Sequence, residues 1–333
     1  MSITRGTAGS VEAVGSSPTP APTSDDAGAR TNRTGTIYGA SAYLLWGAFP
    51  LYFHALLPAS AMEILLHRMI WSLAFCGIAL AVLRQVGWVR PLLRRPARLA
   101  MLAVAAATIA LNWGVYIYAV NSGHVVEAAL GYFFNPLVTV MLGVLLLRER
   151  LRPLQWCATA LGVVAAIVLT LDYGRPPWVA LVLALSFSTY GLMKNRVGVG
   201  LGALASLSTE TALLFPFAIG GLVWLELNGH GTFTSEGTGH TLLLASTGIA
   251  TAVPLLLFAA AARRIPLVTI GLLQFMTPVL QLLCGVLLMG EIVPPSRWIG
   301  FSIVWLALVV LTFDSLRAAH SVRLARAAEG AAV

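Results

Sequence analysis

Few side chains in this sequence could do chemistry, and the most distinctive are charged groups in or beside long apolar stretches. Glu63, His67 and Arg68 stand together near the start of one stretch, and a helix would place Glu63 and His67 on one face because they are four residues apart. Glu127 and Glu210 stand near the start of two other stretches. An ionisable group is costly inside a membrane and usually faces a cavity or a partner. These residues are therefore candidates for solute binding or proton transfer.

Each of these charged residues also has a structural explanation. Arg68 could extend to the outer membrane surface, with Glu63 as its local partner. Glu127 and Glu210 could stabilise the first turns of helices, where unpaired backbone N–H groups and the helix dipole attract anions. The residue types alone leave both assignments open.

A second group of candidates consists of amide and aromatic side chains on neighbouring apolar stretches. Asn112 and Tyr116 share a helix face, and Tyr132 and Asn135 follow on the next stretch, just before Pro136. Aromatic rings offer flat apolar contact with a polar tip, although hydrogen bonding between helices explains such residues equally well. The full set that we expect to line a solute cavity is Tyr43, Trp46, His67, Arg68, Asn112, Tyr116, Glu127, Tyr132, Asn135, Tyr190, Glu210 and Gln274.

The sequence lacks the motifs of known catalytic and metal sites. His54, His67 and Asp172 belong to no HExxH motif, nucleophile elbow or paired-carboxylate motif. There is no phosphate-binding loop, which argues against pumping driven by ATP. The cysteines are odd in number and far apart, so neither a disulfide framework nor a metal motif is indicated: Cys76, Cys157 and Cys284. We expect no catalytic residue, no metal and no cofactor.

The composition indicates an integral membrane protein. Of the 333 residues, 58% are hydrophobic and 10% are charged, whereas a soluble domain is about 45–50% apolar and about 25% charged. The mean hydropathy is +0.84. A soluble fold of this composition would have too little polar surface to cover itself, which excludes a soluble enzyme, a disordered chain and a nucleic-acid-binding module. The net charge of +8 is therefore interpreted as a signal of membrane orientation, and we expect a lipid bilayer and no nucleic acid as a partner.

Long stretches without charges predict an all-α polytopic protein with ten transmembrane helices, since about 20 apolar residues cross a bilayer. The expected spans are centred near residues 46, 75, 109, 137, 162, 185, 216, 251, 278 and 305. Residues 1–34 are rich in Ser, Thr, Gly, Pro and Ala, so we expect a disordered tail there, and residues 316–333 form a C-terminal tail.

The basic residues predict which way the chain crosses the membrane. If both termini are cytoplasmic and ten helices alternate, 18 of the Lys and Arg residues lie on the inner side and 3 on the outer side. The three outer ones are Arg68, Arg175 and Arg297. This asymmetry favours both the number of helices and a cell-membrane protein with cytoplasmic termini.

An internal repeat divides the chain into two halves. With a constant offset of 142 residues, several Pro, Gly, Glu and Trp positions are identical, among them Pro136/Pro278, Gly143/Gly285, Glu149/Glu291, Pro153/Pro295 and Trp156/Trp298. Gln274 matches Tyr132 in this register. The repeat predicts two five-helix units, residues 35–172 and 173–315, and the odd number of helices inverts the second unit in the membrane. Inverted repeats with a site near the midplane are typical of secondary transporters.

Several segments also resemble the RarD branch of the EamA-type drug/metabolite transporters. They are YLLWGAFPLYF (43–53), EILLHRMIWS (63–72), NWGVYIYAVNSGHVVEAALGYFFNPLV (112–138), LLRERLRPLQW (146–156), LSFSTYGLMKN (185–195) and LLQFMTPVLQLL (272–283). The resemblance runs from about residue 36 to residue 315, and the N-terminal tail departs from it. It implies ten helices in two five-helix repeats, cytoplasmic termini and transport of small molecules.

Together these patterns predict a secondary transporter of small organic solutes, with efflux as one direction and a homodimer as one assembly. Proton coupling through Glu127 or Glu210 is a further hypothesis. The alternatives are a polytopic membrane enzyme that acts on lipid and a membrane receptor or scaffold that transports nothing. The short loops argue against the last of these.

Overall fold

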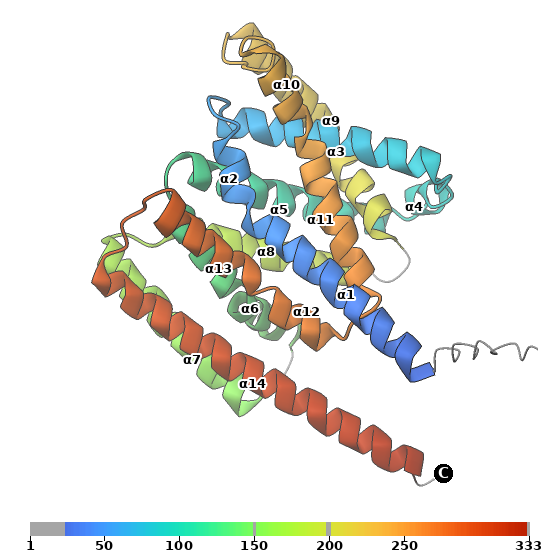
Figure 1. The fold of residues 1–333 in the computed structure, drawn as a ribbon, viewed down its shortest axis with the longest axis vertical. Coiled ribbons are helices and arrows are strands. Elements are labelled where there is room, and N and C mark those ends of the chain that lie inside the picture. Colours follow the sequence, from blue (N-terminus) through green and yellow to red (C-terminus); the bar gives the residue numbers. More distant parts are fainter. Residues whose placement is uncertain (1–23, 149–150, 198–200, 332–333) are drawn as a thin grey trace, which may run out of the picture.

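The computed structural model describes residues 24–148, 151–197 and 201–331, and every regular element within them is a helix (Figure 1). The helices are α1 (Ser24–Gly47), α2 (Phe49–His54), α3 (Ala61–Val82), α4 (Val89–Leu93), α5 (Pro96–Asn121), α6 (Val125–Leu147), α7 (Pro153–Tyr173), α8 (Trp178–Val197), α9 (Ala203–Leu227), α10 (Gly237–Ala245), α11 (Thr247–Ala262), α12 (Leu267–Leu273), α13 (Met276–Leu283), the π-helical turn η1 (Cys284–Leu288) and α14 (Pro295–Ala331).

Eight helical segments of the described residues are long and apolar enough to cross a membrane. They are α3, α5, α6, α7, α9, the continuous pair α10–α11, the segment from Thr269 to Leu288, and α14 up to Ala318. The apolar part of α8, Trp178–Lys194, is shorter, and α1 is not among the eight. The expectation of an all-helical, multi-pass membrane protein is confirmed, and the number of ten spans stays a prediction.

Three of the expected spans are divided in the structure; the one near residue 251 is divided into α10 and α11 at Ser246. Near residue 46 the chain is divided into α1 and α2, and Pro50 lies in the first turn of α2. Near residue 278 it is divided into α12, α13 and η1, with Gln274 at the end of α12. Proline cannot donate a backbone hydrogen bond and disfavours a straight helix, and such breaks expose backbone groups inside a membrane protein.

The terminal helices extend into segments that the sequence assigns to tails. Helix α1 begins at Ser24, within residues 1–34, and α14 continues to Ala331. Once a helix has formed, each added residue gains a hydrogen bond without a new nucleation cost, so an apolar helix can extend into polar sequence. The N-terminal residues 1–23 lie outside the described residues.

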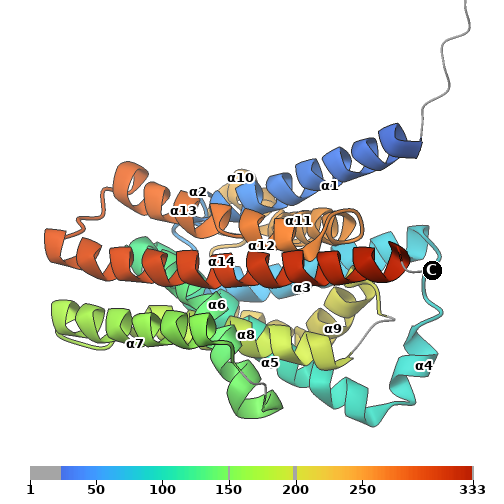
Figure 2. The same ribbon diagram turned by 90° about the horizontal axis from the view of Figure 1, so that it is seen from below.

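The first helix of each predicted half packs against the other half. Helix α8 lies against α5 and α6, whereas α1 lies against α11 and α13 (Figures 1 and 2). Two further pairs, α3 with α9 and α7 with α14, join helices that are equivalent in the repeat register. Gly248 permits the close approach of α11 to α3, because a Cβ atom at this position would overlap the carbonyl group of Trp71. The core therefore lies between segments distant in sequence.

The offset of 142 residues recurs in the helix boundaries. It separates the first residues of α3 and α9 (Ala61 and Ala203), of α6 and α12 (Val125 and Leu267), and of α7 and α14 (Pro153 and Pro295). Ion pairs hold both ends of the antiparallel α7–α14 pair: Arg297 binds Asp172, and Arg152 binds Asp314. The two aspartates are themselves 142 residues apart.

The described ends of the chain lie at the same end of the molecule. Figure 2 shows the start of α1, helix α4 and the C-terminal end of α14 at one end, and the connections α7–α8 and η1–α14 at the other.

Candidate functional site

The most unusual charged group of the structure is Arg68, which lies inside the helix bundle on α3. Its side chain is 4% exposed, and its Nε donates a hydrogen bond to the hydroxyl of Thr251 on α11 at 2.8 Å. Its guanidinium group lies 4.0 Å from the ring centre of Trp113 on α5. It is also 5.4 Å and 5.5 Å from the ring centres of Phe49 and Phe53 on α2. A cation is attracted to the faces of such rings.

Arg68 has no carboxylate partner among the described residues. The ion pairs found there are Arg152–Asp314, Arg175–Glu127, Lys194–Glu210 and Arg297–Asp172. Within the same part of the chain, the only protein hydrogen bond of Arg68's side chain is the one that its Nε makes with Thr251. A guanidinium group carries five N–H donors, so most of its hydrogen-bonding capacity is unused. A buried charge that is neither paired nor fully hydrogen-bonded is costly.

Two further polar atoms near Arg68 are buried without a partner. They are the hydroxyl of Tyr116 on α5 and Oε1 of Gln281 on α13; the two side chains are close enough to interact, but neither atom makes a hydrogen bond of good geometry within the described residues. Tyr116 packs edge-on against Phe53, with ring centres 5.9 Å apart, and so joins this pair to the rings around Arg68. More than nine in ten buried polar groups in proteins have a hydrogen-bond partner. Unpaired groups that gather at one place therefore mark a place for a ligand or water.

We refer to Arg68, Trp113, Tyr116, Thr251 and Gln281 as the central site. Its members come from α3 and α5 in the first half of the chain and from α11 and α13 in the second half. Tyr132 and Asn112 support it, because the Tyr132 hydroxyl donates to Oδ1 of Asn112 at 3.1 Å and the Tyr132 ring packs on Tyr116.

Glu210 lies in a second polar cluster, where α8 meets α9. Its Oε1 accepts hydrogen bonds from Nζ of Lys194 at 2.6 Å and from the hydroxyl of Ser206 at 2.9 Å. Its Oε2 accepts from the hydroxyl of Tyr190 at 3.3 Å. The Glu210 side chain is 1% exposed and that of Lys194 is 30% exposed. Three protein groups thus hold this carboxylate by hydrogen bonds, one of them a cation.

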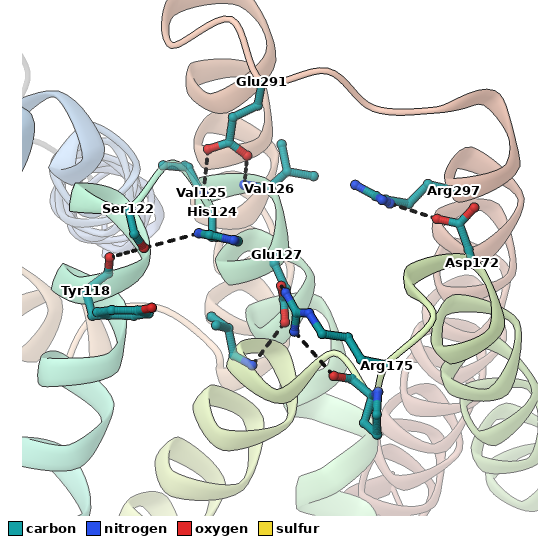
Figure 3. Close-up of polar contacts among 12 residues, drawn as sticks. Tyr118, Ser122, His124, Val125, Val126, Glu127, Asp172, Arg175, Glu291 and Arg297 are labelled. Carbon is teal, nitrogen blue, oxygen red and sulfur yellow. Dashed lines mark hydrogen bonds and ion pairs between the residues drawn. The ribbon is translucent and has the colours of Figure 1, made fainter.

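Glu127 lies in a third cluster, at the ends of helices (Figure 3). Its Oε2 binds Nη2 of Arg175 at 3.1 Å, and its Oε1 accepts the backbone N–H of Val179 in the first turn of α8 at 3.0 Å. Glu291 acts in the same way on α6, since its two oxygens accept the N–H groups of Val125 and Val126 at 2.5 Å and 3.0 Å. Carboxylates at such positions satisfy free N–H groups and complement the helix dipole.

His67 lies apart from Arg68, although the two residues are adjacent in sequence. Its ring stacks on Phe233 at 4.5 Å between centres, and its Nδ1 accepts a hydrogen bond from the Trp71 indole at 3.2 Å. Glu63 accepts the backbone N–H groups of Thr232 and Phe233 at 2.6 Å and 3.1 Å. Glu63 and His67 thus fasten the connection between α9 and α10 to the start of α3.

Three of the remaining predicted residues join helices. Tyr43 and Trp46 pack against Phe258, which places them between α1 and α11. Oδ1 of Asn135 accepts a hydrogen bond from the Ser188 hydroxyl at 2.6 Å, between α6 and α8. Gln274, at the end of α12, is half-buried. Of the predicted set, the central site therefore contains Arg68 and Tyr116, with Asn112 and Tyr132 beside them.

Comparison with known proteins assigns the chain to a family. The model of the EamA-like transporter family matches residues 33–171. The protein RarD of Streptomyces exfoliatus is 55% identical over 291 residues, which are 87% of this chain and 92% of that protein. The chain is a RarD-like member of the EamA-like transporter family.

A further relative and a solved structure are also similar to this EamA family member. An uncharacterized transporter of Pseudomonas aeruginosa is 46% identical over 289 residues, 86% of this chain and 95% of that protein. A solved crystal structure that is 20% identical covers 84% of this chain and 97% of its own, with a TM-score of 0.53. At this identity the structure shows a shared fold and nothing more.

Sequence reasoning missed three members of the central site in this EamA protein: Trp113, Thr251 and Gln281. Gln281 had a signal, because it follows Gln274 by seven residues, two helical turns, and so repeats a polar position on one face. Thr251 is one of two threonines in an otherwise apolar helix and had no such signal.

An apolar groove of about 880 Å³ lies elsewhere, between α14 and the segment from α12 to η1. Its lining includes Phe275, Trp298 and Trp305 and none of the predicted cavity residues. Within the described residues no group of three or more His, Cys, Asp or Glu side chains could hold a metal ion.

Proposed function

We propose that this protein is a secondary transporter that carries a small organic solute across the cell membrane by alternating access. The observation that supports it most is the central site, where Arg68, which has no ion-pair partner among the described residues, contacts Trp113 from the first half of the chain and Thr251 from the second. Inverted-repeat transporters bind their solutes near the midplane at the junction of their repeats. The relative from Pseudomonas aeruginosa is named a transporter, which favours transport over an enzymatic role.

The proposal divides the membrane part into two inverted five-helix halves, residues 35–172 and 173–315. The spacing of 142 residues between the starts of α3 and α9, α6 and α12, and α7 and α14 supports this division. So does the packing, because exchanging equivalent helices turns the contact of α8 with α6 into that of α1 with α13. In this arrangement α1 belongs by sequence to the first half and packs on the second, whereas α8 belongs to the second half and packs on the first.

We further propose that both chain ends face the cytoplasm. The distribution of Lys and Arg, 18 inside and 3 outside, supports this orientation. The position of α4 beside the described ends of the chain agrees with it, because α4 carries Arg90 and is followed by Arg94 and Arg95 (Figure 2).

The function can be tested with purified protein in liposomes. Vesicles loaded with a panel of anionic, neutral and cationic solutes are expected to exchange at least one of them in a saturable way, faster than vesicles without protein. If no solute of any class moves under any imposed gradient, the transport function is refuted.

A matched pair of variants tests whether the solute passes through the central site. The Thr251 and Thr170 hydroxyls each donate to the carbonyl four residues earlier in their own helix, but only Thr251 also accepts from Arg68. Thr251→Val is therefore expected to slow exchange, whereas Thr170→Val on α7 leaves it unchanged. Equal exchange by both variants would place the passage elsewhere.

A further inference from the structure

We infer that the transported solute is an organic monoanion, whose carboxylate binds Arg68 while an aromatic or other apolar body lies against the surrounding rings. This inference rests on the transport function proposed above. It adds the substrate class, which the family description does not supply.

The first argument is charge. Arginine stays protonated in proteins, so the Arg68 charge persists in the bundle and needs a counter-charge. The buried glutamates of the described residues do not provide it: Glu63 binds the backbone of Thr232, while Glu127 and Glu210 bind cations of their own. Within the described residues, Arg68 is the one cation in contact with Phe49, Phe53 and Trp113, which fits a single negative charge on the ligand.

The second argument is the geometry of the guanidinium group. Thr251 holds Nε, which leaves the two terminal nitrogens without a hydrogen bond to the described protein groups. Two neighbouring N–H groups of a guanidinium match the two oxygens of a carboxylate. The face of the group is covered by Trp113 at 4.0 Å, so a ligand would approach along the edge rather than the face.

The third argument concerns the remaining unpaired atoms. The Tyr116 hydroxyl can donate a hydrogen bond to an anionic oxygen, whereas Oε1 of Gln281 can only accept one. A solute with a hydroxyl or amine beside its carboxylate would pair with both. Phe53, which is buried, contacts both Arg68 and Tyr116 and gives this part of the site an apolar character.

The test uses matched probes that differ in charge. We choose 3-phenyllactate and mandelate, their neutral amides, 3-phenylpropionate, which lacks the hydroxyl, and phenyl phosphate, which is mainly a dianion. Binding is measured as the ligand-induced rise in melting temperature of the purified protein, and transport as counterflow in proteoliposomes. We expect the acids to bind at least about tenfold tighter than their amides and tighter than phenyl phosphate, because hydrogen bonds to charged groups are the stronger ones.

Three variants connect the binding to Arg68. Arg68→Gln should weaken binding of the acid roughly tenfold to a hundredfold and abolish its preference over the amide. Arg68→Lys keeps the positive charge but lacks the planar guanidinium group with its two neighbouring N–H donors. It should therefore still bind the acid better than the amide, but more weakly than the wild type does. The control is Arg263→Gln, the same change at an exposed arginine on the end of α11, and it should bind the acid like the wild type.

The outcomes separate this inference from the transport function. If no acid binds better than its amide to the wild-type protein, or if Arg68→Gln keeps the preference, the carboxylate inference is refuted. The same holds if phenyl phosphate binds tighter than the acids. Because the acid–amide comparison needs no variant, it stands even if Arg68→Gln does not fold. If the protein exchanges neutral or cationic solutes and Arg68→Gln does not change the rate, the anionic substrate class is refuted. The proposed transport function would still stand.

Discussion

Breaking the Glu210–Lys194 ion pair from either side should destabilise the protein, and removing both charges should cost no more than removing one. Glu210→Gln keeps the shape and the contacts with Ser206 and Tyr190, but leaves the ammonium of Lys194 without its counter-charge. Removing one partner of a buried pair costs about 3–5 kcal/mol. Lys194 is 30% exposed, so water compensates part of this and we expect about 2 kcal/mol.

The reverse change should cost more. Lys194→Met leaves the carboxylate of Glu210, 1% exposed, without a cation, and we expect a loss of about 3 kcal/mol. The double variant removes both charges and should lose only about 2 kcal/mol in total. The coupling free energy is then about 3 kcal/mol, at the upper end of the range for residues in contact.

The free energy of unfolding can be measured by titration with SDS in mixed micelles, followed by circular dichroism. A control cycle on Arg152 and Asp314 should give about 0.5–1 kcal/mol, because the Arg152 side chain is 48% exposed. If the losses of the two single variants simply add in the double variant, Lys194 and Glu210 do not stabilise one another. Glu210 would then be free to act as the proton-coupling group that its sequence position suggests.

Three other changes test separate parts of the structure. Tyr116→Phe removes a buried hydroxyl without a partner, so stability should stay equal or rise by about 1 kcal/mol while transport falls, and a clear loss of stability would contradict this. Gly248→Ala should push α11 away from α3, which costs about 1–3 kcal/mol in unfolding free energy and slows transport, whereas wild-type stability would show that the contact is loose. Glu291→Gln should lower stability by about 0.5–1 kcal/mol through the weakened first turn of α6, and Glu226→Gln at an exposed site should not; equal values would refute the capping role.

The sequence predicts the membrane class and part of the site, for identifiable reasons. Arg68 and Tyr116 interrupt apolar stretches, and such interruptions are visible without a structure. Thr251 and Gln281 could not be assigned in this way, since their role depends on which helix faces meet. For the same reason, residue type placed Glu127 and Glu210 among the candidates but did not predict that Arg175 and Lys194 would bind them.

The packing of α1 and α8, each against the other proposed half, is also beyond sequence reasoning. Consecutive helices usually pack together, and that rule would place α8 with α9. Instead α8 packs on α5 and α6, where Asn112 and Asn135 bind Ser186 and Ser188. When two possible neighbouring helices are equally apolar, hydrogen bonds between helices can determine which of them α8 packs against.

The most direct test of the inverted arrangement is the side of the membrane on which three single cysteines react. In a background without Cys76, Cys157 and Cys284, Arg94→Cys, Arg264→Cys and Ser235→Cys are labelled with a membrane-impermeant maleimide in intact cells and in inside-out vesicles. Two inverted five-helix halves predict that positions 94 and 264 react only from the cytoplasmic side and position 235 only from outside. Labelling of positions 94 and 264 from opposite sides would contradict the account.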